Sequence, residues 1–87
     1  MAKYMIYAPH TPEQCLQSLD SLMADGNLDK FYFGCKHGDH SGYALVDAPN
    51  DAAALNMVPS FLRSRTQVSE VAKVTPNELT AMHTKAA

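Results

Sequence analysis

Strand-like and helix-like segments alternate along this chain in an order that few folds accommodate. Four apolar or aromatic strand candidates are separated by two helix candidates in the pattern strand-helix-strand-strand-helix-strand. The predicted strands are 3–8, 30–37, 43–48 and 66–74, and the predicted helices are 12–24, 50–58 and a terminal one within 75–87. With right-handed crossovers, this order gives one four-stranded antiparallel sheet that carries both main helices on one face.

The first helix has the clearest boundary signals. Thr11 precedes Pro12, and Gln14 lies three residues after Thr11, which is a typical helix start. Gly26 suits the left-handed conformation that ends many helices. Between these signals, apolar residues at helical spacing predict one buried stripe of Cys15, Leu16, Leu19, Leu22 and Met23. Pro59 is expected to break the second helix, because proline lacks the backbone donor and clashes with the preceding turn.

The first strand is apolar on both of its faces. Tyr4, Ile6 and Ala8 alternate with Met5 and Tyr7, and a strand of this kind is typically covered on both sides. The predicted fold is a ferredoxin-like α+β domain, in which the helices cover only one face of the sheet. Pairing of two sheets face to face in a homodimer would cover the other face.

Length and composition limit the classes of protein to which the chain can belong. Its 87 residues predict a single domain, 1–87, with 75–87 as an appended helix. No apolar run approaches the ~20 residues of a membrane helix, and no secretory signal is visible, so we expect a cytoplasmic protein with reduced cysteines. The net charge is −2 and the basic residues are scattered, which argues against a nucleic-acid partner.

The expected strand order, the length and two segments resemble the dimeric α+β barrel superfamily. The segments are Gly42-Tyr43-Ala44-Leu45-Val46 in the third strand and Thr75-Pro76-Asn77-Glu78-Leu79 at the last helix. This superfamily includes muconolactone isomerase, the antibiotic-biosynthesis monooxygenases and several small uncharacterised stand-alone families, one of them with nickel-binding members. The resemblance implies the fold and the homodimer, and the chain is similar to such a stand-alone family. No catalytic motif of the named enzymes is present, so the resemblance transfers no activity.

Two short segments contain most of the potential metal ligands. One holds His10 with Cys15 close behind, and the other runs from Cys35 to His40, so both cysteines and three of the 4 histidines lie in them. The predicted topology brings both segments to one end of the sheet. Cys35 and His37, two residues apart on a predicted strand, would share a face. Thiolate and imidazole groups suit zinc, nickel or copper, so the sequence predicts a transition-metal site of His10, Cys35, His37 and His40.

Each of these residues also has a purely structural interpretation. Cys15 and Cys35 continue apolar faces and are typical small core residues. His37 and His40 would then be solvated turn residues, and His10 would pack against the first helix. A small organic molecule is an alternative occupant of the same edge, with Tyr7, Tyr43 and Arg63 as its contacts, the arginine because it can hold a carboxylate.

A catalytic interpretation is the main alternative to binding. His10 or His40 would act as a general base, oriented by Asp39, in a cofactor-independent isomerase or monooxygenase acting on a small organic substrate. The substrate would occupy a barrel interior walled by Met5, Tyr7, Phe31 and Phe33.

Two other functional classes can be compared with the sequence. An RNA-recognition module shares the strand order, but Ser41 replaces the leading basic residue of its third-strand signature, and Leu45 and Ala48 replace the stacking aromatics. A purely structural dimerisation module remains open. The favoured hypothesis is a homodimer that binds a metal ion or a small ligand at the His/Cys edge.

Overall fold

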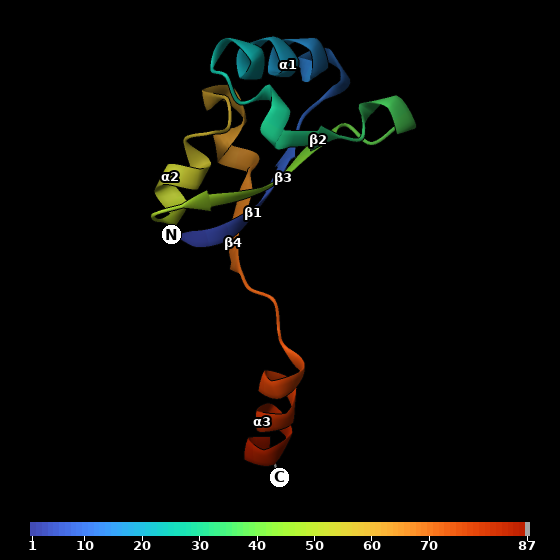
Figure 1. Cartoon of the computed structure of the whole chain (residues 1–87). Coiled ribbons are helices and arrows are strands. Elements are labelled where there is room, and N and C mark those ends of the chain that lie inside the picture. Colours follow the sequence, from blue (N-terminus) through green and yellow to red (C-terminus); the bar gives the residue numbers. More distant parts are fainter. Residues whose placement is uncertain (87) are drawn as a thin grey trace.

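Four strands form one antiparallel sheet in the order β2-β3-β1-β4 (Figure 1). They are β1 (Ala2–Pro9), β2 (Phe31–Phe33), β3 (Ser41–Ala48) and β4 (Gln67–Val71). The computed structural model describes residues 1–86. β1 pairs with β3 on one side and with β4 on the other, and β2 pairs with the far edge of β3. The prediction of a mixed α+β chain with a four-stranded antiparallel sheet is confirmed.

Short helices lie between the strands, and one more follows the last strand. The α-helices are α1 (Cys15–Ala24), α2 (Asp51–Leu55) and α3 (Pro76–Ala86), and the 3-10 helices are η1 (Pro12–Gln14), η2 (Leu28–Lys30), η3 (Cys35–His37) and η4 (Ser60–Arg65). Residue 87, the last of the predicted terminal helix, lies outside the described residues. Within residues 1–86, no helix combines the length and the apolar composition that crossing a bilayer requires.

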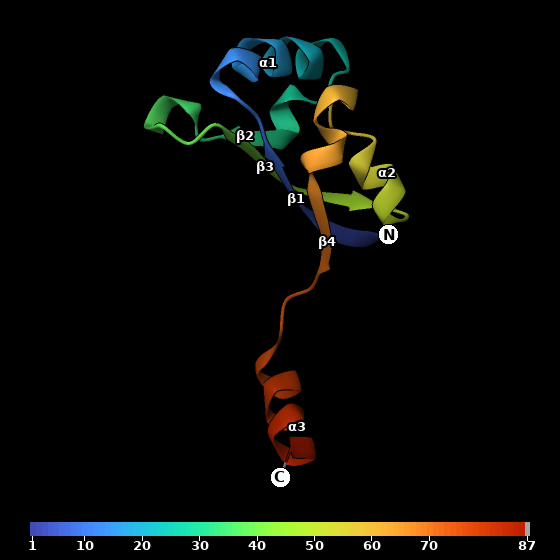
Figure 2. The same cartoon turned by 180° about the vertical axis from the view of Figure 1, so that it is seen from behind.

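The core lies on one face of the sheet. Along β1, Tyr4, Ile6 and Ala8 are buried. They share one hydrophobic cluster with residues from both helical segments, among them Leu22 of α1 and Ala54 of α2. The two helices therefore cover the same face, as the order of elements predicts, and Figure 2 shows this layer from behind.

The opposite face of the sheet, which we call the open face, carries exposed apolar side chains. Its β1 and β3 residues Met5 and Leu45 pair across the strands and are 44% and 52% exposed. Further members from β1, β2 and β3 are Tyr7, Tyr32 and Tyr43. Within one chain, β1 is thus covered on one side only, although its sequence is apolar on both.

The helical segment begins at Pro12, as the sequence predicts, but its first turn is the 3-10 helix η1 and α1 begins only at Cys15. The Gln14 side chain accepts a hydrogen bond from the Thr11 N–H at 3.1 Å, which satisfies a backbone donor that the helix itself leaves unpaired. Pro12 opens the preceding 3-10 turn. After the helix, Gly26 takes the expected positive φ of 73°.

The buried stripe of α1 differs from the predicted one. Leu16 and Met23 are each 69% exposed, whereas Leu22 and Ser18 are buried. The Ser18 hydroxyl donates to the Gln14 carbonyl at 2.7 Å, so its burial leaves no donor unsatisfied. The buried side of α1 is therefore centred on Ser18 and Leu22, with Leu19 half-buried beside them.

Helix α2 ends earlier than predicted. The Asn50 side chain accepts from the Ala53 N–H at 2.8 Å and caps the helix start. The helix ends at Leu55, and after Pro59 the chain continues as the 3-10 helix η4. The prediction that Pro59 prevents a longer helix agrees with this arrangement.

Strand β2 is much shorter than the predicted 30–37. It ends at Phe33, and the Gly34 carbonyl accepts from the N–H groups of His37 at 2.9 Å and Asp39 at 3.0 Å. These bonds turn the chain into η3. The prediction that Cys35 and His37 share one face of a strand is therefore wrong, because both lie in a 3-10 turn.

Strand β4 and helix α3 also differ from expectation. Val71 pairs with Lys3, near the start of β1 at Ala2, so positions 72–74 have almost no neighbouring strand left to pair with and the predicted strand 66–74 is shortened. Helix α3 then projects away from the sheet at the end of an extended segment, as both views show (Figures 1 and 2). Its residues 76–85 are all exposed.

Candidate metal site

A main-chain hydrogen bond joins the two loops that the sequence singles out. The His10 N–H donates to the His40 carbonyl at 3.0 Å, immediately beyond the pairing of Pro9 with Ser41 at the ends of β1 and β3. In Figures 1 and 2 the green hairpin that contains η3 lies on the same side as the blue segment leading into α1. The prediction that both loops lie at one end of the sheet is confirmed.

Four side chains converge between these loops. One potential ligand atom from each of His10, Cys15, Cys35 and His40 lies within 4.8 Å of all the others, and we call this set the His/Cys group. The Cys15 and Cys35 Sγ atoms are 3.0 Å apart, and Cys35 Sγ is 3.3 Å from His10 Nε2. The two imidazole rings meet edge to face, with centroids 5.9 Å apart.

The group differs from the predicted ligand set in one member. His37 is exposed and does not belong to it, because the 3-10 turn separates it from the neighbouring Cys35. Cys15 takes its place as the first residue of α1. The sequence holds a signal for this: Cys15 lies five positions after His10, just inside a helix whose start is fixed by Thr11 and Pro12.

Neither cysteine lies in the hydrophobic core. Both are free thiols with partly exposed side chains, and the buried core cluster contains neither of them. The interpretation of Cys15 and Cys35 as small core residues therefore does not describe their surroundings. Each sulfur instead has the other sulfur as a close neighbour.

His10 is buried and His40 is half-buried. His10 is only 6% exposed, and burial, followed by the nearby His40, lowers its pKa below the usual value. It is therefore the neutral imidazole, with a free lone pair, at neutral pH. The Nδ1 atoms of His10 and His40 are both buried, and neither has a hydrogen-bond partner among the described residues. Buried polar atoms without partners are uncommon in proteins.

Burial also affects the Cys35 thiol. Desolvation, and then the adjacent Cys15 sulfur, raise the pKa of Cys35 to about 11. At neutral pH the side chain is therefore a protonated thiol rather than an activated nucleophile. Removing its proton requires a positive charge at this position, which a metal ion would supply.

The Asp39 carboxylate has a different role from the one predicted for catalysis. It accepts a hydrogen bond from the Tyr43 hydroxyl at 2.6 Å, and this bond, helped by Ser41, lowers the pKa of Asp39. Within residues 1–86, no hydrogen bond joins it to His10 or His40. The histidine–aspartate pair that a general base would use is therefore not formed.

The residues predicted to contact an organic ligand lie in separate places. Tyr7 and Tyr43 are neighbours on the open face, with ring centroids 5.4 Å apart. Arg63 donates to the Val58 carbonyl at 2.9 Å and to the Asn56 carbonyl at 3.2 Å, so it holds the chain after α2 in place.

The predicted barrel interior is also divided between two faces. Phe31 pairs with Ala44 and is buried, and Phe33, two residues on, lies on the same helix-covered side. Met5 and Tyr7 lie on the open face. The prediction that these four side chains wall one interior is wrong, because their strand positions have opposite parity relative to the sheet.

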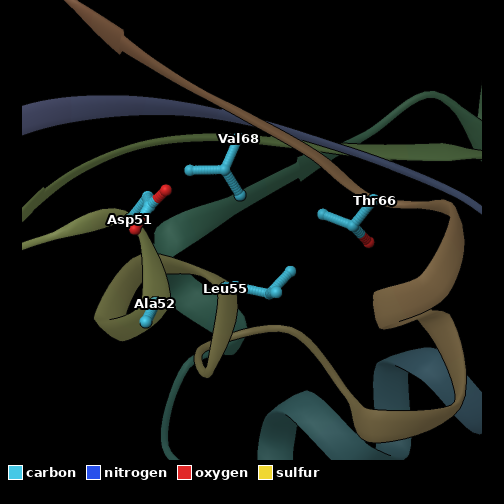
Figure 3. A pocket seen from close by; sticks show the side chains of 5 residues that line it. All are labelled: Asp51, Ala52, Leu55, Thr66 and Val68. Carbon is cyan, nitrogen blue, oxygen red and sulfur yellow. The ribbon is translucent and has the colours of Figure 1, made fainter.

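Two shallow surface pockets outside the His/Cys group border the sheet. One of about 350 Å³ lies between α2 and β4 and is lined by Asp51, Ala52, Leu55, Thr66 and Val68 (Figure 3). The Thr66 hydroxyl there already donates to the Leu62 carbonyl. The other, about 860 Å³, is a groove beside the open face where β1, β3 and β4 meet. Neither is lined by a histidine or a cysteine.

Replacing Gly34 by alanine is expected to distort the site. A Cβ at this position would lie 2.7 Å from both the Cβ and the carbonyl oxygen of Asp39, and that oxygen accepts from the Ser41 N–H at 2.9 Å. The hairpin must shift to relieve the clash, so we expect metal affinity to fall at least ~10-fold and the free energy of unfolding to fall by about 1–3 kcal/mol. Isothermal titration and urea denaturation measure the two effects. Lys36→Ala, at an exposed position of the same hairpin, is the control, and an unchanged affinity in Gly34→Ala would contradict the role of Gly34.

The donor set determines what the site can do chemically. Two sulfurs and two imidazoles are soft or borderline ligands, and together they can hold a transition-metal ion. Comparisons of the chain with protein-family models, with curated proteins and with solved structures gave no match.

Proposed function

We propose that the protein binds one Zn²⁺ ion per chain with His10, Cys15, Cys35 and His40 as ligands. The observation that carries the proposal is the convergence of four donor atoms within 4.8 Å, two of them on histidines with buried, unpartnered ring nitrogens. A set of two sulfurs and two imidazole nitrogens is typical of tetrahedral zinc sites. Nickel and copper remain the competing ions.

The distances within the group support this ligand set. At ordinary Zn–S and Zn–N bond lengths, tetrahedral ligand atoms lie about 3.3–3.8 Å from one another. The Cys35 Sγ to His10 Nε2 distance of 3.3 Å falls in this range. The Cys15 Sγ to Cys35 Sγ distance of 3.0 Å lies below it, and the widest separation of 4.8 Å exceeds it by about one ångström. Rotation of the partly exposed Cys35 and His40 side chains of the hairpin would close these differences.

A closed set of four protein ligands favours binding over catalysis. Catalytic zinc sites usually keep one position for water or substrate, whereas structural sites fill all four positions with protein ligands. The site would join α1 to the β2–β3 hairpin, since Cys15 belongs to the first and Cys35 and His40 to the second. Such a site can stabilise the domain, hold metal in reserve or report its concentration.

Metal titration of protein purified without a histidine tag tests the proposal. We expect one Zn²⁺ per chain by elemental analysis, and a melting temperature that rises with metal concentration because only the folded chain holds the four ligands together. Parallel titrations with Ni²⁺ and Cu⁺ identify the preferred ion. No bound metal, together with no thermal shift for any of the three ions, would overturn the proposal.

We further propose that the chain is a ferredoxin-like member of the dimeric α+β barrel superfamily, and that two copies pair through their open faces. The strand order β2-β3-β1-β4 and the placement of both main helices on one face support the fold. The exposed apolar side chains on the other face, such as Met5 and Leu45, support the pairing, since contiguous exposed apolar surface often marks an interface.

Replacing Leu45 by glutamate is expected to separate the dimer. The side chain is 52% exposed in the middle of the open face, and a carboxylate there would be buried without a partner on association, so the dissociation constant should rise at least ~100-fold. Light scattering after size-exclusion chromatography measures the mass. Leu16→Glu, at a 69% exposed position of α1, is the matched control and should leave the mass unchanged. A Leu45→Glu protein with the mass of the unmodified one would exclude this interface.

A further inference from the structure

The distance between the Cys15 and Cys35 sulfurs lies between the values for a disulfide bond and for two thiolates on one zinc ion. These two states exclude each other. The two sulfurs are 3.0 Å apart. A disulfide bond requires about 2.05 Å, and two thiolates on one tetrahedral zinc ion lie about 3.8 Å apart. Either state is therefore reached by a movement of about one ångström or less, and a disulfide would leave zinc with only the two imidazoles.

We propose that Cys15 and Cys35 form a reversible disulfide that competes with zinc for the same sulfurs, so that oxidation releases the metal. This inference rests on the zinc-binding function proposed above. The oxidant is a low-molecular-weight disulfide of the glutathione class.

The exchange balances in two steps. One protein thiolate attacks the small disulfide, forms a mixed disulfide and displaces one small thiolate. The second protein sulfur then attacks the mixed disulfide, forms the Cys15–Cys35 bond and displaces the other small thiolate. Overall, the two protein thiolates lose two electrons, the small disulfide gains them to become two thiolates, and Zn²⁺ leaves unchanged in oxidation state.

The positions of the two cysteines suit this exchange. Both side chains are partly exposed, so a small disulfide can reach one of them. The other sulfur is already 3.0 Å away, which favours closure within the chain over a lasting mixed disulfide. Gly34, which precedes Cys35, is held by backbone bonds to Ser41 and Asp39, and these bonds do not involve either sulfur.

The experiment uses the reduced, zinc-loaded protein and oxidised glutathione. Intact mass spectrometry follows the covalent state, and a chromogenic chelator follows zinc release. We expect a mass lower by two hydrogen atoms, release of one zinc ion per chain, a fall in zinc affinity of more than about 1,000-fold because two of four ligands are lost, and full recovery on reduction with a phosphine.

The His40→Ala variant separates the failure of this inference from the failure of the proposed function. It keeps both cysteines, so it should form the disulfide while binding zinc weakly even when reduced. Cys35→Ser should form no internal disulfide and instead keep glutathione on Cys15.

Three results would overturn the inference. These are glutathione retained on the unmodified protein, disulfide-linked pairs of chains, and an internal disulfide that leaves zinc bound with unchanged affinity. In each of these cases zinc binding by the reduced protein still stands. Absence of zinc binding by the reduced protein would overturn the proposed function, and the competition with it, even if the disulfide forms.

Discussion

Zinc affinity is expected to fall more than about 100-fold when Cys35 is replaced by serine. Loss of an outer-shell partner of a metal ligand alone costs 10–100-fold in affinity, and this substitution removes a ligand itself. Serine has nearly the same size, but its hydroxyl does not ionise near neutral pH to give a charged donor. Cys35 Sγ also lies close to two of the other three ligands, 3.0 Å from Cys15 Sγ and 3.3 Å from His10 Nε2. Its replacement therefore removes the donor atom that is nearest to both. Competition titration against a chelator of known affinity measures the change.

His37→Ala is the matched control for this prediction. His37 lies two residues from Cys35 in the same 3-10 turn, is exposed, and does not belong to the His/Cys group. Its removal should leave zinc affinity unchanged within about twofold. If His37→Ala weakens binding as much as Cys35→Ser does, the ligand set predicted from the sequence is right and the one described here is wrong.

Replacing Leu22 by alanine is expected to lower the free energy of unfolding by about 3 kcal/mol. Leu22 is 2% exposed and is the residue through which α1 reaches the core cluster. Truncation of a buried leucine removes its transfer free energy and leaves a cavity, which together typically cost 2–5 kcal/mol. A domain of this size has about 5–10 kcal/mol of stability in total. Urea denaturation of the metal-free protein measures the change without a contribution from zinc.

Leu16→Ala provides the comparison within the same helix. Leu16 is 69% exposed, so its truncation should change stability by less than about 0.5 kcal/mol. The sequence predicts that Leu16 and Leu22 are both buried, whereas in the structure only Leu22 is buried. Equal destabilisation by the two substitutions would contradict the packing of α1 described here.

The order of helices and strands was predictable because the residues that mark their ends are local in the sequence and agree with one another. Thr11, Pro12 and Gly26 mark both ends of the first helix, and the order of elements then leaves few topologies. The face that α1 buries was less predictable. Hydrophobicity alone favours Leu16 over Ser18, and only the bond from Ser18 to the Gln14 carbonyl makes burial of the serine favourable.

The candidate site was predictable to the level of its loops but not of its full ligand set. Strand directions bring His10 near His40, and this required no side-chain information. The prediction of His37 as a ligand is wrong because strand alternation ends at Gly34, where the chain turns. Helical periodicity places Cys15 on a hydrophobic stripe, because periodicity cannot distinguish a core position from one at the edge of the buried face.

The bond from the His10 N–H to the His40 carbonyl belongs to the main chain, so any residue other than proline at position 10 keeps its donor. If the proposed function holds, the main chain at this rim of the sheet is already in position without a metal ion, so binding would cost little backbone entropy. The ligand side chains could then change without a change in the main chain that holds them. Exchanging one ligand at a time would adapt the same edge of the sheet to a harder or softer ion.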